Sequence, residues 1–269
     1  MNLDQSIQLK ACYYIPDYLT EKDKQNFMKS LEQTPLHKWE ILQKANRRLQ
    51  KWGGDVTPQG LQNQEKLPQF MQIIVDKIHE QSQITQYKPN HILLNEYPPQ
   101  VGIMPHTDGP LYIPFVCSIT FGCNALFKFY KNYQDYKDKK FAVQLVLEDN
   151  CLCVFTQDLY ENYLHCLEDI PIEYIYLDLK EIDGWDEGQK EIVVQNCDTA
   201  NFLSTNLYKK LKSFSSLEMA VQAEFLMPVK IQENEKQEPQ YNYAIELKRE
   251  KQRISLTIRH VKNEIEKIQ

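Results

Sequence analysis

The sequence predicts a mainly β domain with helices at its N-terminal end, and three observations lead to this fold class. Short β-rich runs follow one another from His91 onward, most of them separated by Gly, Pro, Asn or Asp, as in an all-β sandwich or barrel. The clearest helical periodicity lies before His91. The chain has 269 residues, of which 42% are hydrophobic, which is enough to bury a core without disulfides.

Two helices are expected in the N-terminal third. Thr20, with Asp23 three residues later, resembles a capping box, and the apolar residues that follow predict a helix over about 20–33. A second helix begins near Pro68, a residue suited to a first helical turn. Its apolar positions form one stripe that is expected to pack into the core. They are Phe70, Ile73, Ile74 and Ile78.

The strands are expected in six clear runs, followed by a looser region. The six runs are 91–97, 115–121, 125–130, 141–147, 151–155 and 253–260. Between Cys166 and Lys251 we expect strands near 172–177 and 191–195, a helix near 199–212 and a mobile polar loop at 232–242.

The charge is unevenly distributed along a chain whose net charge is −6. Lys38 to Lys51 holds five cations and one acid, whereas Asp158 to Asp198 holds twelve acids and two lysines. Both runs are explained most simply as solvated faces. The alternative makes the first a phosphate-contacting lid and the second an acidic insertion turned away from the substrate. A nucleic-acid partner would therefore have to meet a local basic patch.

The composition excludes several classes of protein. No apolar run approaches the roughly 18 residues that a membrane span needs, and Met1 to Leu9 contains no secretory hydrophobic region. The seven cysteines are odd in number and scattered, so we expect reduced thiols rather than a disulfide scaffold. We therefore expect an intracellular protein of the cytoplasm and/or nucleus, with no membrane partner.

A His-x-Asp pair marks the first candidate site. Residues i and i+2 of an extended backbone point to the same side, so His106 and Asp108 can present an imidazole and a carboxylate to one point. One further histidine would complete the two-His, one-carboxylate triad of non-haem Fe(II) oxygenases. A loop histidine beside a turn aspartate is the alternative explanation.

The third ligand has to come from a distant histidine. His165 follows the predicted strand 151–155 after a short turn, and a jelly roll brings strands far apart in sequence together. This makes His165 the best candidate, with a hydrogen-bonded core histidine as the alternative. The other histidines lie in the helical third or at strand ends: His37, His79, His91 and His260.

Two strands carry polar faces that suit a dicarboxylate. Arg253 and Arg259 share one face of the alternating last strand, in a chain with only five arginines, and a guanidinium is the best carboxylate partner among side chains. Asn95 and Tyr97 share a face of the strand 91–97 and can donate hydrogen bonds to a carboxylate. An exposed edge strand and an ordinary polar strand end are the alternatives.

The motifs agree with one known family in order and in most gaps. They are Asn95-x-Tyr97, His106-x-Asp108, His165 and Arg253-x5-Arg259, together with Leu49-Gln50-x-Trp52-Gly53-Gly54. This pattern resembles the AlkB family of Fe(II)- and 2-oxoglutarate-dependent dioxygenases. The resemblance covers roughly 11–165 and 251–262 and is specific, because several independent motifs agree in sequence order.

The resemblance implies a double-stranded β-helix, or jelly-roll, core. It would occupy 91–269, with an acidic insertion at about 167–250, and would follow an N-terminal helical and lid region at 1–90. The gap from His165 to Arg253 is far longer than in compact members of the family, and the resemblance says nothing about the role of the extra segment.

The resemblance also assigns site residues. His106, Asp108 and His165 would hold Fe(II), and Arg253 would pair with the distal carboxylate of 2-oxoglutarate. Four residues would complete the co-substrate and active-site shell, although one of them, the serine, stands where many members of the family carry Asn. They are Asn95, Tyr97, Ser255 and Arg259.

The implied reaction is oxidative N-demethylation of alkylated RNA or DNA, with Fe(II), 2-oxoglutarate and O2, in which the methyl group leaves as formaldehyde. A base in a duplex would have to be flipped out. A lid could combine stacking with phosphate contact, although its tryptophans are equally well explained as core residues. The lid residues are Trp39, Lys44, Arg47, Arg48, Lys51 and Trp52.

Two other classes of function stay open. The same iron chemistry could act on a protein side chain or a small molecule, an option that the acidic segment keeps open. The chain could also be a metal-binding jelly-roll module without turnover, but such an interaction protein would not need both arginines of the last strand.

Overall fold

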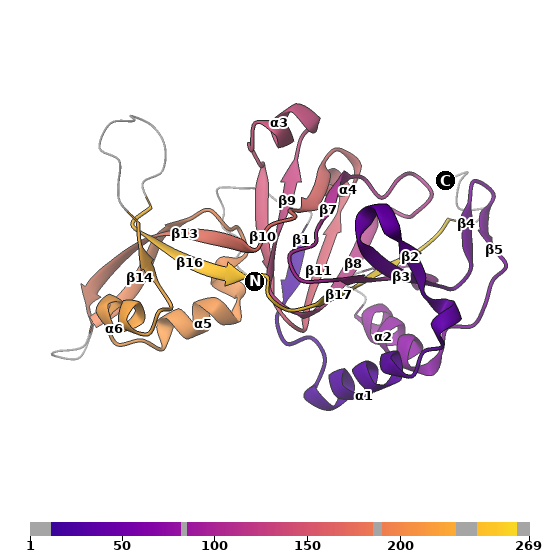
Figure 1. Cartoon of the computed structure of the whole chain (residues 1–269), viewed down its shortest axis with the longest axis horizontal. Coiled ribbons are helices and arrows are strands. Elements are labelled where there is room, and N and C mark those ends of the chain that lie inside the picture. Colours follow the sequence, from indigo (N-terminus) through magenta and orange to yellow (C-terminus); the bar gives the residue numbers. More distant parts are fainter. Residues whose placement is uncertain (1–11, 82–84, 185–189, 230–240, 263–269) are drawn as a thin grey trace.

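The structure is a computed structural model and describes residues 12–81, 85–184, 190–229 and 241–262. Two facing sheets form a sandwich, helices cover one outer face of it, and a smaller unit of strands and helices lies beside it (Figure 1). The mainly β fold with N-terminal helices and a double-stranded β-helix core is thereby confirmed. The loop predicted at 232–242 lies largely outside the described residues.

The larger sheet of the sandwich holds seven antiparallel strands. Most of the clear runs predicted from sequence belong to it, and the N-terminal region adds three strands. Their order is β1 (Cys12–Ile15), β11 (Cys151–Thr156), β8 (Phe115–Gly122), β17 (Arg253–Arg259), β6 (His91–Tyr97), β3 (Arg47–Trp52) and β2 (Glu40–Leu42). Neighbours such as β17 and β6 are therefore hydrogen-bonded although they are far apart in sequence.

The smaller sheet faces the cavity side of the larger one. Its four antiparallel strands run in the order β10 (Val143–Leu147), β9 (Ala125–Tyr130), β12 (Leu164–Leu167) and β7 (Ile103–His106). Sequence reasoning predicted β9 and β10 but neither β7 nor β12, because each of these has only four residues. Short elements lie between the strands: α3 (Tyr133–Lys137) follows β9, and α4 (Gln157–Glu161) follows β11. The hairpin of β4 (Asp55–Thr57) and β5 (Gly60–Gln62) follows β3 of the larger sheet.

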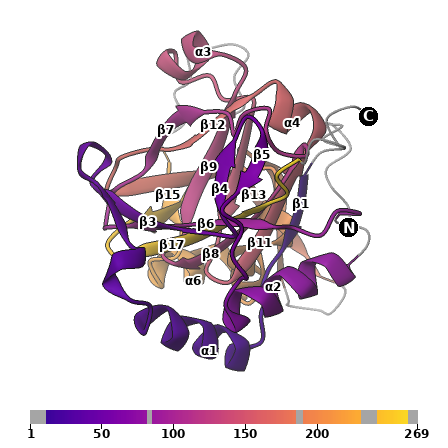
Figure 2. The same cartoon turned by 90° about the vertical axis from the view of Figure 1, so that its right-hand side faces the viewer.

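The helices α1 (Glu21–Glu32) and α2 (Gln69–Glu80) cover the outer face of the larger sheet (Figure 2). The predicted capping box of α1 is present, because the Thr20 hydroxyl accepts a hydrogen bond from the Asp23 N–H at 3.2 Å. In α2 the apolar stripe is partly different from the prediction. Ile74 and Ile78 are buried, but Ile73 is half exposed because it lies on the solvent side of the helix.

The polar and apolar faces of the larger sheet explain where the site lies. The isoleucines and leucine of β17 pack with β6, β8, α1 and α2 in one hydrophobic cluster. The polar face of β17 is therefore directed into the sandwich, toward β7, β9 and β12. The arginines of β17 therefore lie on the interior side of the sandwich, and its aliphatic residues pack toward the helices.

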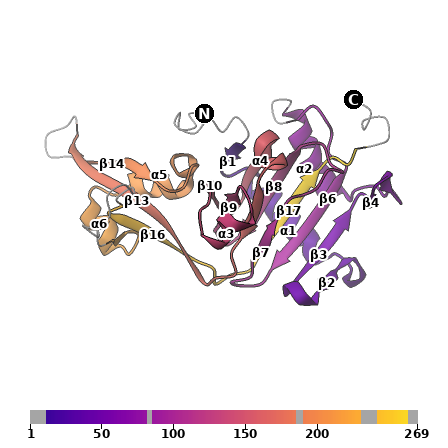
Figure 3. The same ribbon diagram turned by 90° about the horizontal axis from the view of Figure 1, so that it is seen from above.

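The elements between residues 172 and 248 form the smaller unit, which lies beside the sandwich at the left of Figure 3. Its sheet runs β14 (Lys190–Cys197), β13 (Ile172–Asp183), β16 (Tyr243–Lys248) and β15 (Met227–Pro228). The helix predicted at 199–212 is two: a 3-10 turn, η3 (Phe202–Ser204), and α5 (Asn206–Lys212). Extended Thr205 breaks the helix, because its hydroxyl caps α5 by accepting from the Tyr208 N–H. A further helix, α6 (Leu217–Gln222), was not predicted.

Candidate active site

His106 and His165 lie opposite each other on the paired strands β7 and β12. Their ring centroids are 4.4 Å apart. The chain leaves β7 immediately after His106 and brings Asp108 back beside His165, with 3.8 Å between Asp108 Oδ2 and His165 Nε2. The strand pairing therefore brings together His106 and His165, which are 59 positions apart in the sequence.

The three side chains can share one metal ion. Each offers a ligand atom, and these atoms all lie within 4.8 Å of one another. Among the residues that the structure describes, this is the one such group of histidine, cysteine and acidic side chains. Asp108 Oδ2 and His165 Nδ1 are buried without hydrogen-bond partners, which leaves these polar atoms in need of a ligand.

The electrostatics keep His165 ready to bind a cation. Burial lowers its pKa to about 3, with smaller effects from His106 and Arg259, while Asp108 acts in the opposite direction. The imidazole is therefore neutral at neutral pH, which is the form that binds metals. Three phenylalanine rings surround it, with centroids 5.0–6.0 Å from its own: Phe127, Phe129 and Phe155.

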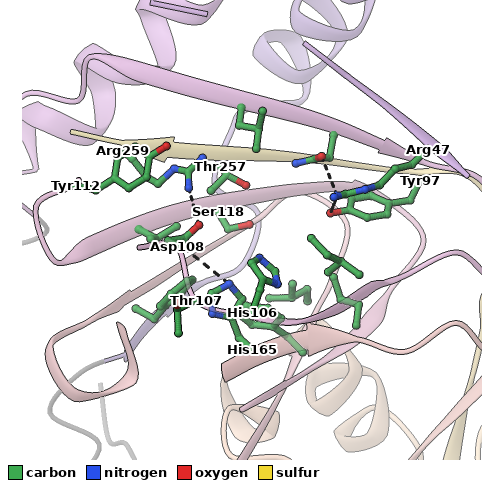
Figure 4. Close-up of a pocket in the computed structure, with 18 residues that line it drawn as sticks. Arg47, Tyr97, His106, Thr107, Asp108, Tyr112, Ser118, His165, Thr257 and Arg259 are labelled. Atoms are coloured by element: carbon green, nitrogen blue, oxygen red, sulfur yellow. Dashed lines mark hydrogen bonds and ion pairs between the residues drawn. The ribbon is translucent and has the colours of Figure 1, made fainter. Parts of the chain in front are cut away.

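A cavity of about 330 Å³ opens between the two sheets at this triad, close to the lower limit for small-molecule pockets. In Figure 4, Arg259 and Tyr112 lie at one end of the cavity, and Arg47 and Tyr97 lie at the other. The histidines lie between these two ends. The cavity thus has a guanidinium at each end and the metal ligands in the middle.

At the first end, Arg259 orients the metal-binding carboxylate. Its Nη1 donates to Asp108 Oδ1 at 2.5 Å, and its Cζ lies 4.1 Å from the ring centroid of Tyr112. Asp108 Oδ2 stays free of this contact. The guanidinium therefore fixes one carboxylate oxygen and leaves the other for the metal, as partners of metal ligands commonly do.

At the second end, Arg47 reaches into the cavity from β3. Its Nη1 donates to Asn95 Oδ1 at 2.9 Å and to the Tyr97 hydroxyl at 3.1 Å. Asn95 and Tyr97 lie on the cavity face of β6, as their sequence spacing suggested.

Arg253 and Ser255 lie beside the cavity without lining it. Arg253 is 1% exposed, and its Nη1 donates to the Thr120 hydroxyl at 3.2 Å. Ser255 forms a hydroxyl–hydroxyl contact of 3.3 Å with Ser118, which does line the cavity.

The residues predicted for the lid do not share one surface. Arg48 lies over the Trp39 ring at 4.0 Å and forms a bidentate pair with Glu96. Lys51 pairs with Glu40, and Lys44 is exposed. Trp52 is buried with the helices in the core.

Several cavity residues were not found from the sequence: Thr107, Tyr112, Ser118, Phe127 and Thr257. One signal was available. Phe127 and Phe129 alternate on the strand 125–130 and so share a face, but nothing in their spacing tells that this face surrounds a histidine.

A comparison with protein families identifies the chain. The family model described as the 2OG-Fe(II) oxygenase superfamily matches residues 11–259. The chain belongs to this superfamily. With the triad in place, this oxygenase is a 2-oxoglutarate-dependent dioxygenase, and its cofactor, co-substrate and oxidant are Fe(II), 2-oxoglutarate and O2.

One named relative of the oxygenase supports the AlkB resemblance. A zebrafish (Danio rerio) protein named probable RNA/DNA demethylase ALKBH6 is 34% identical over 174 residues, which are 61% of this chain and 73% of the relative. Among solved structures, OsALKBH1 has 12% identity and a TM-score of 0.48, over 93% of this chain and 96% of its own. A Pseudomonas putida prolyl-4-hydroxylase has 9% identity and a TM-score of 0.41, over 60% and 85%.

No helix among the described residues of the oxygenase is long and apolar enough to cross a membrane.

Proposed function

We propose that this dioxygenase removes N-linked methyl groups from alkylated RNA or DNA. The observation that carries the proposal is the complete triad of His106, Asp108 and His165 in a cavity with a guanidinium at each end. The sequence similarity to the probable RNA/DNA demethylase supports the substrate class.

The chain's own residues have distinct tasks in this reaction. His106, Asp108 and His165 would hold Fe(II), which, with 2-oxoglutarate and O2, supplies the oxidising power for attack on a methyl group. Arg259 holds Asp108 in its binding orientation. The phenylalanines around His165 give the metal side of the cavity an apolar wall, which would limit access of water and so protect the reacting centre from side reactions.

The substrate would approach past the hairpin formed by β2 and β3. This hairpin carries Lys44, Arg48 and Lys51, and Arg48 is stacked on Trp39. Cations next to an aromatic ring suit a single-stranded backbone with its bases. Arg48 and Lys51 are already paired with Glu96 and Glu40, so phosphate contact would require these pairs to exchange partners.

The test is a panel of methylated RNA and DNA oligonucleotides, single- and double-stranded, incubated with the protein, Fe(II) and 2-oxoglutarate. We expect mass spectrometry to show loss of a methyl group with stoichiometric succinate, and neither product when 2-oxoglutarate is omitted. Succinate formed with methylated peptides or small molecules, but with no oligonucleotide, would contradict the nucleic-acid substrate and leave the dioxygenase activity intact.

A further inference from the structure

Tyr97 lies between two arginines in the larger sheet. Strand β6 is hydrogen-bonded to β17 on one side and to β3 on the other. Arg253 is the direct partner of Tyr97 across β17, and its Cζ lies 4.6 Å from the Tyr97 ring centroid. On the β3 side, the Cζ of Arg47 lies 5.4 Å from the same centroid. Two guanidinium groups therefore contact one tyrosine at the end of the cavity, which Arg47 lines and Arg253 does not.

These two arginines differ from the other three in the chain. Arg48, Arg249 and Arg259 each pair with a carboxylate. Within the described ranges, Arg47 and Arg253 form no ion pair, since their side-chain partners are an amide oxygen and hydroxyl groups.

The surroundings of both groups leave their charge uncompensated. The Nε atoms of Arg47 and Arg253 are buried without hydrogen-bond partners. Arg253 is a buried cation without an anion, which is costly. Arg47 is half-buried and adds a second positive charge at the same place. An anion bound between them would offset this cost, and a carboxylate is the anion whose two oxygens best match a guanidinium.

We propose that Arg47 is a second partner of the distal carboxylate of 2-oxoglutarate, beside Arg253, whose contact with it the family resemblance already implies. The proposal rests on the superfamily's co-substrate and adds Arg47, a residue of the hairpin β2–β3, to the co-substrate site. The keto acid end of the diacid then lies toward the triad, and the distal end reaches Tyr97. Asn95, which now accepts from Arg47, keeps the guanidinium directed into the cavity.

This arrangement links the co-substrate to the hairpin. Arg47 lies at the start of β3, directly after the turn that joins β3 to β2. A carboxylate bound by Arg47 would therefore hold the hairpin against the cavity mouth. Amide hydrogens of residues 40–52 should then exchange more slowly when 2-oxoglutarate is bound.

The decisive experiment compares two ligands that differ only at the distal end. 2-Oxoglutarate and 2-oxopentanoate, which has a methyl group in place of the distal carboxylate, are titrated calorimetrically into Mn(II)-loaded protein without oxygen. We expect Arg47→Ala to weaken 2-oxoglutarate about 10- to 100-fold, as for a hydrogen bond to a charged group. Its affinity for 2-oxopentanoate should stay within about twofold of that of the unmodified protein.

Lys131→Ala is the control, because it removes one positive charge from an exposed residue that does not line the cavity. It should leave 2-oxoglutarate affinity unchanged. Arg47→Lys keeps the charge but lacks the fork and should lose affinity to an intermediate extent. If Arg47→Ala does not fold, the affinity of Arg47→Lys for the two ligands tests the same contact.

Three results would count against specific parts of the proposal. Equal effects of Arg47→Ala on both ligands, or no effect on either, would overturn the contact between Arg47 and the distal carboxylate. Unchanged hydrogen exchange at 40–52 on addition of 2-oxoglutarate would overturn the link to the hairpin. Failure of the unmodified protein to bind 2-oxoglutarate would instead remove the co-substrate assignment itself.

Discussion

At the scale of single residues, burial alone does not make a histidine a metal ligand. His91 and His165 are both buried, and burial lowers the pKa of each to about 3. Only His165 has a carboxylate and a second imidazole within ligand distance. Arg259 lies near both, but it completes the site only where it holds Asp108. The neighbouring side chains therefore decide whether a buried histidine can be a metal ligand.

Asp108→Asn should abolish metal binding while keeping the fold. The amide oxygen can still accept from Arg259, but the negative charge that attracts the ion is lost. Removing even a partner of a metal ligand costs about 10- to 100-fold in affinity, so we expect a larger loss here. Titration with Mn(II) measures it, and Asp158→Asn, at an exposed acid on α4, serves as the control. Affinity within threefold of the unmodified protein would show that Asp108 is not a ligand.

At the scale of elements, the alternation of β3 divides the basic run into two functions. Arg47 faces the cavity, whereas Arg48 faces Trp39 and Glu96 on the other side of the sheet. The run looked like one patch in the sequence, but a strand sends neighbouring residues to opposite faces. The position of β3 against β6 therefore decides which cation enters the site.

Gly53 fixes that position, because a Cβ there would meet Asn90 O at 2.1 Å and its φ is +102°. We expect Gly53→Ala to destabilise the protein by more than about 3 kcal/mol, since strain adds to a backbone clash. Gly109→Ala is the matched control, with φ +87° and open space around the Cβ, and should cost about 1–2 kcal/mol. Urea unfolding distinguishes them. Equal losses would mean that the close approach to Asn90 is unimportant.

At the scale of the whole molecule, the smaller unit shares a hydrophobic core with the sandwich. Its core includes Leu126 of β9 and Val146 of β10. A buried ion pair joins the same regions: Arg249 Nη1 lies 3.1 Å from Glu173 Oε2, and both side chains are 1% exposed. Glu173 also accepts from the Leu126 N–H, and Arg249 donates to the Val101 carbonyl.

Arg249→Met should destabilise the protein by about 3–5 kcal/mol at neutral pH, because it leaves a carboxylate buried without its partner. Adding Glu173→Gln should recover at least half of this loss, since the amide oxygen can still accept from Leu126. Lys190→Met, in a surface ion pair with Glu181 of the same unit, should leave the free energy of unfolding nearly unchanged. Chemical denaturation measures all three. A double variant no more stable than Arg249→Met would show that the buried charge is not the cause.

Much of the fold could be predicted from the sequence where the pattern is local and strong. The helices at Thr20 and Pro68 and the strands 91–97, 151–155 and 253–259 are confirmed. The four-residue strands β7 and β12 could not be found, because they are too short to show a period. Their stability comes from pairing with each other and with β9, which is information held elsewhere in the chain.

The chemical groups of the site can be read from the residues alone: the His-x-Asp pair, the distant histidine and the rare arginines stand in an order that matches one superfamily. The face of the sheet that each of them occupies depends on how the strands pair. This pairing directs the polar side of β17 into the sandwich and places Arg47 beside Tyr97. Each residue carries its own ligand atom, so the kinds of ligand are visible in the sequence. Whether these atoms come together at one point depends on the register in which strands from distant segments pair, and that register is visible only in the folded sheets.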